Sequence, residues 1–323
     1  MKKAALLLFL LPAVALAQQS TGEPGPEGTV PTSVTFPIER VQTPTNADLY
    51  CAGFVGKRVE SKDKFVTGGL ESPFTTQYAN GEAIFLNGKG YQAGQEYTVI
   101  RELADPNRYE LFAGQWSAIK AAGQTYEELA RIQVVDTRSK MAVARVEFSC
   151  DVVLPGDFVI PFVEKPASAF HAPMRFDRFV PANGQPSGRI IMAKDFDSQL
   201  GTGGKVYLNI GSNQGLKIGD FVRAERSFDA VSRDPNDSLS FNASIVDPNQ
   251  AHQPTMVAGS SGFKFMPGFM YSKSGPEVHI SQMPRKAIGE IVILGTTPTT
   301  ATGMIVFALE PVYVGDRVEL DQQ

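Results

Sequence analysis

The chain contains one stretch of sequence twice, and this internal repeat limits its fold more than any other feature. Residues 132–159 align without a gap with residues 291–318, at a constant offset of 159 positions. Eight of the 28 aligned pairs are identical, and most of the others exchange one apolar residue for another. A shorter match, at an offset of 122 positions, joins residues 77–87 to residues 199–209. Two blocks that recur in the same order indicate one folding unit used twice, and a chain of 323 residues is long enough for two such domains.

Short apolar segments separated by turn residues predict that both units are mainly β. In the first unit we expect strands at 52–59, 83–87, 96–101, 129–136, 141–150 and 158–162, and a short helix at 116–122. The second and third of these strands are expected to pair as a hairpin. In the second unit we expect strands at 189–193, 205–210, 221–225, 291–295, 301–309 and 317–320. Such short strands are typical of small antiparallel barrels, so two β-barrels in tandem are predicted, the second with a long insertion.

Four segments of the second unit combine core and turn residues in a recognisable pattern. They are VYLNIGS (206–212), GLKIGD (215–220), IGEIVI (288–293) and GDRV (315–318). This pattern resembles the SH3-like C-terminal domain of the bacterial flagellar assembly protein T and related envelope proteins. The resemblance covers the framework of the second unit and, more faintly, the first, where Gln95 stands in the place of Asp220. It implies two SH3-like barrels in a periplasmic binding or assembly module without catalysis. The whole arrangement is also similar to uncharacterised secreted proteins of acidobacteria.

The first residues of the chain predict export. Lys2 and Lys3 precede an apolar run at 4–14, and a small-residue cleavage site follows at 15–17. The expected organisation is a signal peptide (1–17), a flexible Pro/Gly-rich tether (18–48), a first barrel (49–163), a connector (164–187) and a second barrel (188–321) that contains an insertion (227–286). We expect a periplasmic or extracellular protein, with the outer membrane as a further place of association, and no membrane span in the mature chain.

Cys51 and Cys150 are the only cysteines, and they stand near the two ends of the first unit. In an oxidising compartment they are expected to form a disulfide bond. In the chain-entropy description, closing a loop of about 100 residues stabilises a fold by roughly 4 to 5 kcal/mol. The alternative is a pair of buried free thiols. A catalytic cysteine is not expected, because the first unit contains no histidine to activate it.

The last long strand of each unit differs in its outward face. In the first unit, residues 141–150 alternate an apolar face with a polar one that carries Arg145 and Glu147. In the second unit the corresponding outward residues are Thr302, Met304, Val306 and Ala308. A face this apolar needs a cover, and we assign that role to the insertion (227–286).

No motif in the chain predicts catalysis or a cofactor. The segment GTGGK at 201–205 lacks the spacing of a phosphate-binding loop and leads into a strand. Three Gly-Asp pairs are expected to be structural turns in which the Asp caps backbone amides: Gly156-Asp157, Gly219-Asp220 and Gly315-Asp316. The three histidines are scattered without the spacing of metal ligands. We therefore expect no catalytic, cofactor or metal site, and the net charge of -4 disfavours binding of nucleic acid.

The candidate contacts to a partner are apolar residues of the insertion and the connector. In the insertion they are Phe263, Phe265, Met266, Phe269, Met270 and Tyr271. In the connector, Phe170, Met174, Phe176 and Phe179 are expected to pack across the barrels. The insertion residues either pack on the second barrel or form a docking loop. The predicted function is an exported, non-enzymatic interaction or assembly module of the bacterial cell envelope, with an unidentified envelope protein as its partner. The alternative is a module that binds peptidoglycan, the cell-wall glycan, and an enzyme is the least favoured class.

Overall fold

The structure is a computed structural model, and it describes most of the chain from residue 41 onward. The described residues are 41–70, 75–166, 176–179, 181–227 and 284–321, together with the backbone of three short strands, β12 (Ser238–Asn242), β13 (Thr255–Ala258) and β14 (Glu277–His279). They all belong to one compact unit, residues 35–323. The predicted signal peptide and most of the predicted tether lie outside the described residues.

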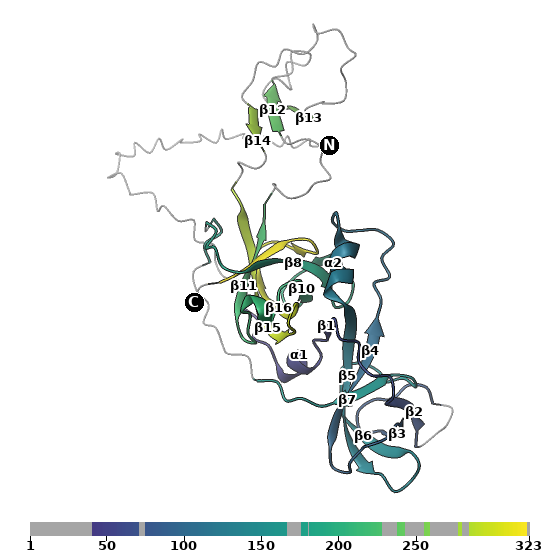
Figure 1. The fold of residues 1–323 in the computed structure, drawn as a ribbon. Coiled ribbons are helices and arrows are strands. Elements are labelled where there is room, and N and C mark those ends of the chain that lie inside the picture. Colours follow the sequence, from purple (N-terminus) through teal and green to yellow (C-terminus); the bar gives the residue numbers. More distant parts are fainter. Residues whose placement is uncertain are drawn as a thin grey trace, which may run out of the picture. The chain divides into compact units, whose positions relative to one another are not determined.

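The first barrel closes from six antiparallel strands (Figure 1). They are β2 (Phe65–Gly69), β3 (Ala83–Asn87), β4 (Glu96–Leu103), β5 (Gln124–Asp136), β6 (Ala142–Ser149) and β7 (Phe158–Pro161). Their order is β5-β4-β7-β2-β3-β6, and the pairing of β5 with β6 closes the ring. A short additional strand, β1 (Phe54–Gly56), pairs with the beginning of β5. The helix α2 (Gln115–Ala122) lies in the β4–β5 connection and ends at Gly123, as the sequence predicts.

The second barrel also closes from six antiparallel strands. They are β8 (Ser187–Ala193), β10 (Lys205–Leu208), β11 (Phe221–Arg226), β15 (Lys286–Thr296), β16 (Ala301–Ala308) and β18 (Arg317–Leu320). Their order is β15-β11-β18-β8-β10-β16, which matches the first barrel strand for strand. The remaining elements are the helices α1 (Asn46–Tyr50) and η1 (Ser212–Gln214), the pair β9 (Gln199–Leu200) with β17 (Val312–Tyr313), and the sheet β13-β12-β14. The prediction of two small tandem β-barrels is therefore confirmed.

The repeat extends to the register of the strands. Ile132 lies opposite Val146 in the first barrel, and Ile291 lies opposite Ile305 in the second. Both residues of the second pair stand 159 positions after their counterparts in the first. The two register shifts along β5–β6 recur at the aligned places of β15–β16, and those of β4–β5 and β2–β3 recur in β11–β15 and β8–β10. Bulges of this kind set where a strand bends, so the two barrels share their curvature as well as their strand order.

Two strand predictions in the first barrel are wrong. The barrel begins with β2 at Phe65–Gly69 and not at 52–59, where only the short β1 forms. Glycines weaken the strand pattern of β2, yet a Cβ at Gly69 would collide with the ring of Tyr78, so the close packing there requires a glycine. The hairpin prediction also fails, because β4 pairs with β5 and β7 while β3 pairs with β2 and β6.

Each barrel encloses its own apolar core. In the first barrel the core includes Val66, Ile84, Leu86, Val99, Leu129, Ile132, Val134, Ala144, Val146 and Val159. In the second barrel it includes Ile190, Val206, Leu208, Leu216, Val222, Ile288, Ile291, Ile293, Ile305 and Val318. Most of these residues occupy aligned positions of the repeat, so what the two copies share is mainly their interior.

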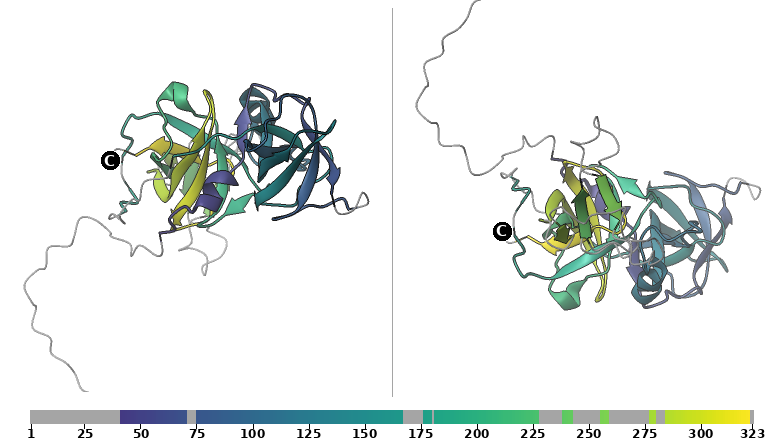
Figure 2. Two further views of the ribbon diagram at one scale, coloured as in Figure 1. Left: turned by 90° about the horizontal axis from the view of Figure 1, so that it is seen from below. Right: turned by 90° about the horizontal axis from the view of Figure 1, so that it is seen from above.

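The apolar outward face of β16 is covered, as predicted, but the described cover comes from a different part of the chain. Met304 and Val306 are buried in a cluster with Leu49 and Ala52, and Phe176 of the connector packs at its edge. The N-terminal segment supplies this contact, and α1 lies against the strands of the second barrel in Figures 1 and 2. The side chains of the insertion, to which the cover was assigned, lie outside the described residues from 228 to 283. Threonine 45 caps α1 in a capping box, so the predicted tether (18–48) ends inside an ordered helix.

The predicted disulfide bond between Cys51 and Cys150 is present, with the two Cα atoms 5.5 Å apart. Disulfides of this kind persist in oxidising compartments. Among the described residues, no helix is both long and apolar enough to cross a membrane.

Candidate functional site

The turn residues named from the sequence share one geometry. Asp157, Asp220 and Asp316 each accept a hydrogen bond from the backbone amide three residues earlier, at 2.6, 2.8 and 2.7 Å respectively. The glycines before them, Gly156, Gly219 and Gly315, have left-handed φ angles of 96°, 93° and 109°. The six candidate contact residues of the insertion, from Phe263 to Tyr271, lie outside the described residues.

Two of these aspartates also bind an arginine that the sequence analysis missed. Arg101 donates hydrogen bonds to both oxygens of Asp157 at 2.8 and 2.8 Å, and Arg226 binds Asp316 in the same way at 3.0 and 2.7 Å. In each barrel the guanidinium also donates to a carbonyl oxygen of the preceding turn. We call this arrangement the arginine clasp. Because it occurs in both copies and fixes the turn before the last strand, we assign it a structural role.

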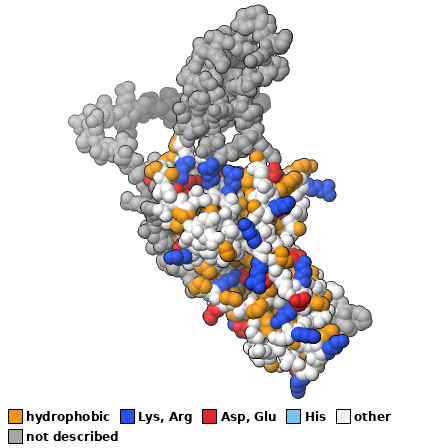
Figure 3. All heavy atoms as spheres, in the orientation of Figure 1, with side chains coloured by type: hydrophobic (Ala, Val, Ile, Leu, Met, Phe, Trp, Pro, Cys, Tyr) orange, Lys and Arg blue, Asp and Glu red, His pale blue; other side chains and the backbone are white. Residues whose placement is uncertain are grey.

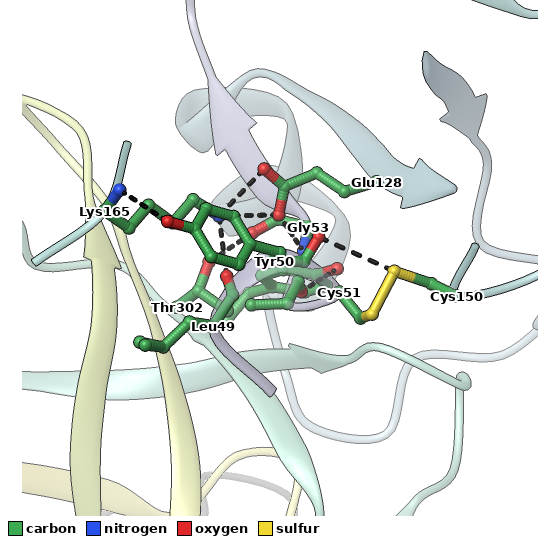
Figure 4. Close-up of polar contacts among 10 residues, drawn as sticks. Leu49, Tyr50, Cys51, Gly53, Glu128, Cys150, Lys165 and Thr302 are labelled. Carbon is green, nitrogen blue, oxygen red and sulfur yellow. Dashed lines mark hydrogen bonds and ion pairs between the residues drawn. A yellow bond between two sulfur atoms is a disulfide. The ribbon is translucent and has the colours of Figure 1, made fainter. Parts of the chain in front are cut away.

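The segment that joins α1 to β1 contacts both barrels (Figure 4). The ammonium group of Lys165 donates to the carbonyl oxygen of Leu49 at 2.8 Å and to both carboxylate oxygens of Glu128 at 2.8 and 2.7 Å. The amide of Gly53 donates to Glu128 at 3.1 Å, and the amide of Lys165 donates to the hydroxyl of Tyr50 at 3.2 Å. The buried carboxylate of Glu128 is thus neutralised and held by the connector and by the N-terminal segment.

The second barrel binds the other side of the same segment. The hydroxyl of Thr302 donates to the carbonyl oxygen of Gly53 at 2.9 Å, and the hydroxyl of Tyr207 donates to that of Ala52 at 3.2 Å. Gly53 has a φ of 69°, and a Cβ there would lie 2.6 Å from the Tyr207 hydroxyl, so only glycine fits. Burial raises the pKa of Tyr207, which therefore stays a neutral donor. We assign these contacts a structural role, because each polar group named here forms its hydrogen bond within the protein.

A charged cluster lies on the second barrel where β11 ends and β15 begins (Figure 3). Arg285 donates to Glu225 at 2.5 Å and to Glu319 at 2.8 Å, and both carboxylates are almost fully buried. Arg223 binds Asp321 beside them at 2.9 Å. Burial raises the pKa of Glu225 to about 7, with Arg285 opposing and Glu319 adding to the effect. One guanidinium thus binds both carboxylates, and the group forms a charge network of the second barrel.

A hollow of about 270 Å³ lies next to this cluster. Its walls come from the β4–β5 connection of the first barrel and from β8, β11, β17 and β18 of the second, and they include Leu111, Phe112, Arg189, Arg226, Tyr313 and Arg317. The guanidinium of Arg189 lies 4.9 Å from the ring centre of Phe112, and that of Arg226 lies 4.4 Å from the ring centre of Tyr313. We call this hollow the arginine hollow. It combines positive charge with apolar surface.

The β4–β5 connection is anchored by buried residues and displays exposed ones beside the arginine hollow. Gln115 is 1% exposed, and its side-chain amide donates to the carbonyl oxygen of Ile191 in β8 at 3.1 Å. Phe112 packs against the second core. By contrast, Tyr109 is 81% exposed and Trp116 is 52% exposed. The connection thus presents large apolar side chains from a fixed backbone, which is the arrangement that contact surfaces use.

A larger hollow, of about 810 Å³, lies on the first barrel. Its charged lining residues are Arg58, Glu60, Asp63, Lys64, Lys89 and Lys140. Lys64 lies over the rings of Tyr91 and Tyr97, at 4.8 and 5.2 Å from their centres. The hollow therefore has an excess of positive charge, although most of its charged side chains are exposed.

No protein-family model matches this chain, and no curated protein matches it either. Among the described residues, no group of three or more potential ligands could hold a metal ion.

Proposed function

We propose that this chain is an exported, non-enzymatic interaction module of the bacterial cell envelope, and that the β4–β5 connection forms its contact surface to another protein. The observation that carries the proposal is the exposure of Tyr109, Leu111 and Trp116 in a segment that Phe112 and Gln115 anchor on the second barrel. A solitary exposed apolar residue needs no explanation, but three of them in one short anchored segment favour a contact site.

The chemistry of these residues supports a protein partner. Tryptophan, tyrosine and arginine are the residue types that most often dominate the binding energy of protein interfaces. Aromatic side chains also lose little conformational freedom when they become buried, and an anchored segment has less backbone freedom to lose. The exposed residues therefore provide contact area at a small entropic cost.

The location and the absence of catalysis in this proposal rest on other features. The lysines and apolar run at the N-terminus favour export, and the Cys51–Cys150 bond is of the kind that oxidising compartments permit. Within the described residues, the conserved charges of the repeat are engaged in the arginine clasps, which leaves them bound to each other instead of to a substrate. The resemblance to SH3-like envelope domains also favours an envelope protein without catalytic activity.

Capture of a partner from envelope extracts tests the proposal. With the tagged full chain as bait, the double substitution Tyr109→Ser and Trp116→Ser should reduce the captured partner by about tenfold or more, because both side chains would leave the interface. Val135→Ser is the matched control, since Val135 is 49% exposed but lies on β5, away from the connection. Full capture by a double variant that still unfolds at the same temperature would contradict the proposal.

The alternative is binding of peptidoglycan, and the larger hollow of the first barrel is the observation that favours it. Its excess of lysine and arginine side chains could bind the carboxylates of a cell-wall glycan. Sedimentation of the chain with purified peptidoglycan tests this reading, with Lys89→Glu and Lys140→Glu combined as the variant. Co-sedimentation that the double variant loses would support the alternative, and no co-sedimentation of the unchanged chain would remove it.

A further inference from the structure

One pair of aligned positions differs sharply between the two barrels. In the first barrel Phe65 of β2 lies opposite Phe158 of β7, and in the second barrel Arg189 of β8 lies opposite Arg317 of β18. The strand register around both pairs is the same, so the two pairs occupy equivalent places on the outer surface. Two aromatic rings at such a place stabilise a sheet, whereas two like charges directly opposite each other destabilise it.

Neither arginine is neutralised within the described residues. No carboxylate forms an ion pair with Arg189 or Arg317, and neither guanidinium donates a hydrogen bond. Asp316 is held by Arg226, and Glu225, which lies opposite Arg317 on its other side, is held by Arg285. Burial and the neighbouring Arg317 lower the pKa of Arg189, and the carboxylate of Asp316 opposes them. The barrel therefore keeps two arginines side by side with which no carboxylate of the described residues forms an ion pair.

Both arginines line the arginine hollow, together with apolar side chains. We infer that this hollow binds an acidic segment of a partner protein, with an Asp or Glu carboxylate held between Arg189 and Arg317 and a neighbouring apolar side chain placed against Leu111 and Tyr313. Arginine suits this role because its planar guanidinium binds carboxylates with two parallel hydrogen bonds. The inference rests on the proposed function, since it names the chemistry of the partner that the β4–β5 connection contacts.

The same residues disfavour a dense polyanion such as a nucleic acid or an anionic membrane. The carboxylates of Glu225 and Asp316 also line the hollow, so a closely spaced row of negative charges would meet repulsion beyond the arginine pair. The net charge of the whole chain, -4, adds to that repulsion. A single carboxylate beside an apolar residue fits the hollow better.

Fluorescence anisotropy with the full chain tests the inference directly. The probe is a short fluorescein-labelled peptide of alternating Glu and Leu, and the control peptides replace Glu with Gln or with Lys. We expect the Glu peptide alone to bind, with an affinity that falls as salt is added, because a charge pair supplies the selectivity. Equal binding of the Gln peptide, or binding of anionic vesicles or peptidoglycan fragments in place of the Glu peptide, would overturn the inference.

Two variants distinguish a binding role from a structural one. Arg189→Glu creates an opposite-charge pair with Arg317, and Arg189→Phe with Arg317→Phe copies the pair of the first barrel. Both should unfold at the same or a higher temperature than the unchanged chain, and both should bind the Glu peptide about tenfold or more weakly. A loss of stability in both variants would mean that the arginines belong to the framework of the barrel, and the inference would then be wrong.

The outcome also separates this inference from the proposed function. The Tyr109 and Trp116 double variant can lose the envelope partner while Arg189→Glu keeps it. That result would support the β4–β5 connection as the contact surface and contradict the binding of an acidic segment in the arginine hollow. If neither variant loses the partner, both the proposed function and this inference fail. Loss of the partner by both variants, with salt sensitivity in the unchanged chain, supports the two together.

Discussion

At the scale of single residues, the second barrel differs from the first in where its charges lie. The arginine clasp is common to both barrels and ties a turn to the strand beside it. Of the other buried carboxylates, Glu128 belongs to the first barrel, whereas Glu225 and Glu319 belong to the second and align with Ile100 and Ile160 of the first. The two barrels therefore share the arginine clasp, and only the second barrel has the charge network around Arg285.

The arginine clasp should contribute measurably to stability. Arg101→Ala leaves the nearly buried carboxylate of Asp157 without its cation, and we expect the free energy of unfolding in urea to fall by about 2 to 3 kcal/mol. Arg138→Ala is the matched control, because Arg138 binds Asp136 in a similar two-point geometry but is 90% exposed. That variant should change stability much less than Arg101→Ala does, because water screens an exposed ion pair. Equal losses in both variants would show that burial of the clasp is irrelevant.

The charge network predicts a dependence of stability on pH. Burial raises the pKa of Glu225 to about 7 from an ordinary value of 4.5, so the folded protein binds this proton more tightly than the unfolded chain does. The stabilisation from Glu225 is therefore complete below pH 4.5 and is lost as the pH rises through about 7. Thermal melts of the Glu225→Gln variant across this range should lack that loss. Glu147→Gln, on the outward face of β6, should keep it, and identical profiles for all three proteins would refute the assignment.

At the scale of elements, the sequence predicted most of the strands but not how all of them pair. The alignment of 132–159 with 291–318 located β5, β6, β15 and β16, because an apolar period of two residues is directly visible there. β2 was missed because Gly68 and Gly69 interrupt its pattern, and the sequence does not show that the ring of Tyr78 packs on Gly69 and leaves no room for a side chain there. Neighbouring strands in a barrel need not be neighbours in sequence, which is why the predicted hairpin of β3 and β4 does not form.

The candidate site was less visible in the sequence than the fold. The cover of β16 was expected from its apolar outward residues, but nothing in the sequence tells whether an insertion or an N-terminal segment supplies it. The arginine hollow depends on Leu111 and Tyr313, which are far apart in the chain and meet only when both barrels are folded. One signal was available: Phe158 aligns with Arg317 in the gapless repeat, so an aromatic residue is exchanged for a charged one there. The matching exchange of Phe65 for Arg189 becomes visible only once β2 is located.

At the scale of the whole molecule, one segment contacts both barrels. Residues 49–55 bind Glu128 and Lys165 on one side and the hydroxyls of Tyr207 and Thr302 on the other. The barrels also meet at the β4–β5 connection, through Gln115. The arginine hollow is built from residues of both barrels, so its shape depends on these contacts.

Reduction of the disulfide should weaken the molecule as a whole. Cys51 and Cys150 are 99 residues apart in sequence, and a loop of that length contributes about 4 to 5 kcal/mol in the chain-entropy description. Urea unfolding with and without dithiothreitol should show a loss of this order. The Cys51→Ala, Cys150→Ala double variant should match the reduced protein and ignore the reductant. A loss below about 1 kcal/mol would mean that the loop is already constrained in the unfolded chain.

The disulfide bond joins two parts of the chain that pack on different barrels. Cys51 belongs to the segment that packs on the second barrel, and Cys150 directly follows β6 of the first barrel. Where thiols stay reduced this cross-link is absent, and the segment that carries Cys51 is then held beside the second barrel by its hydrogen bonds and apolar contacts alone.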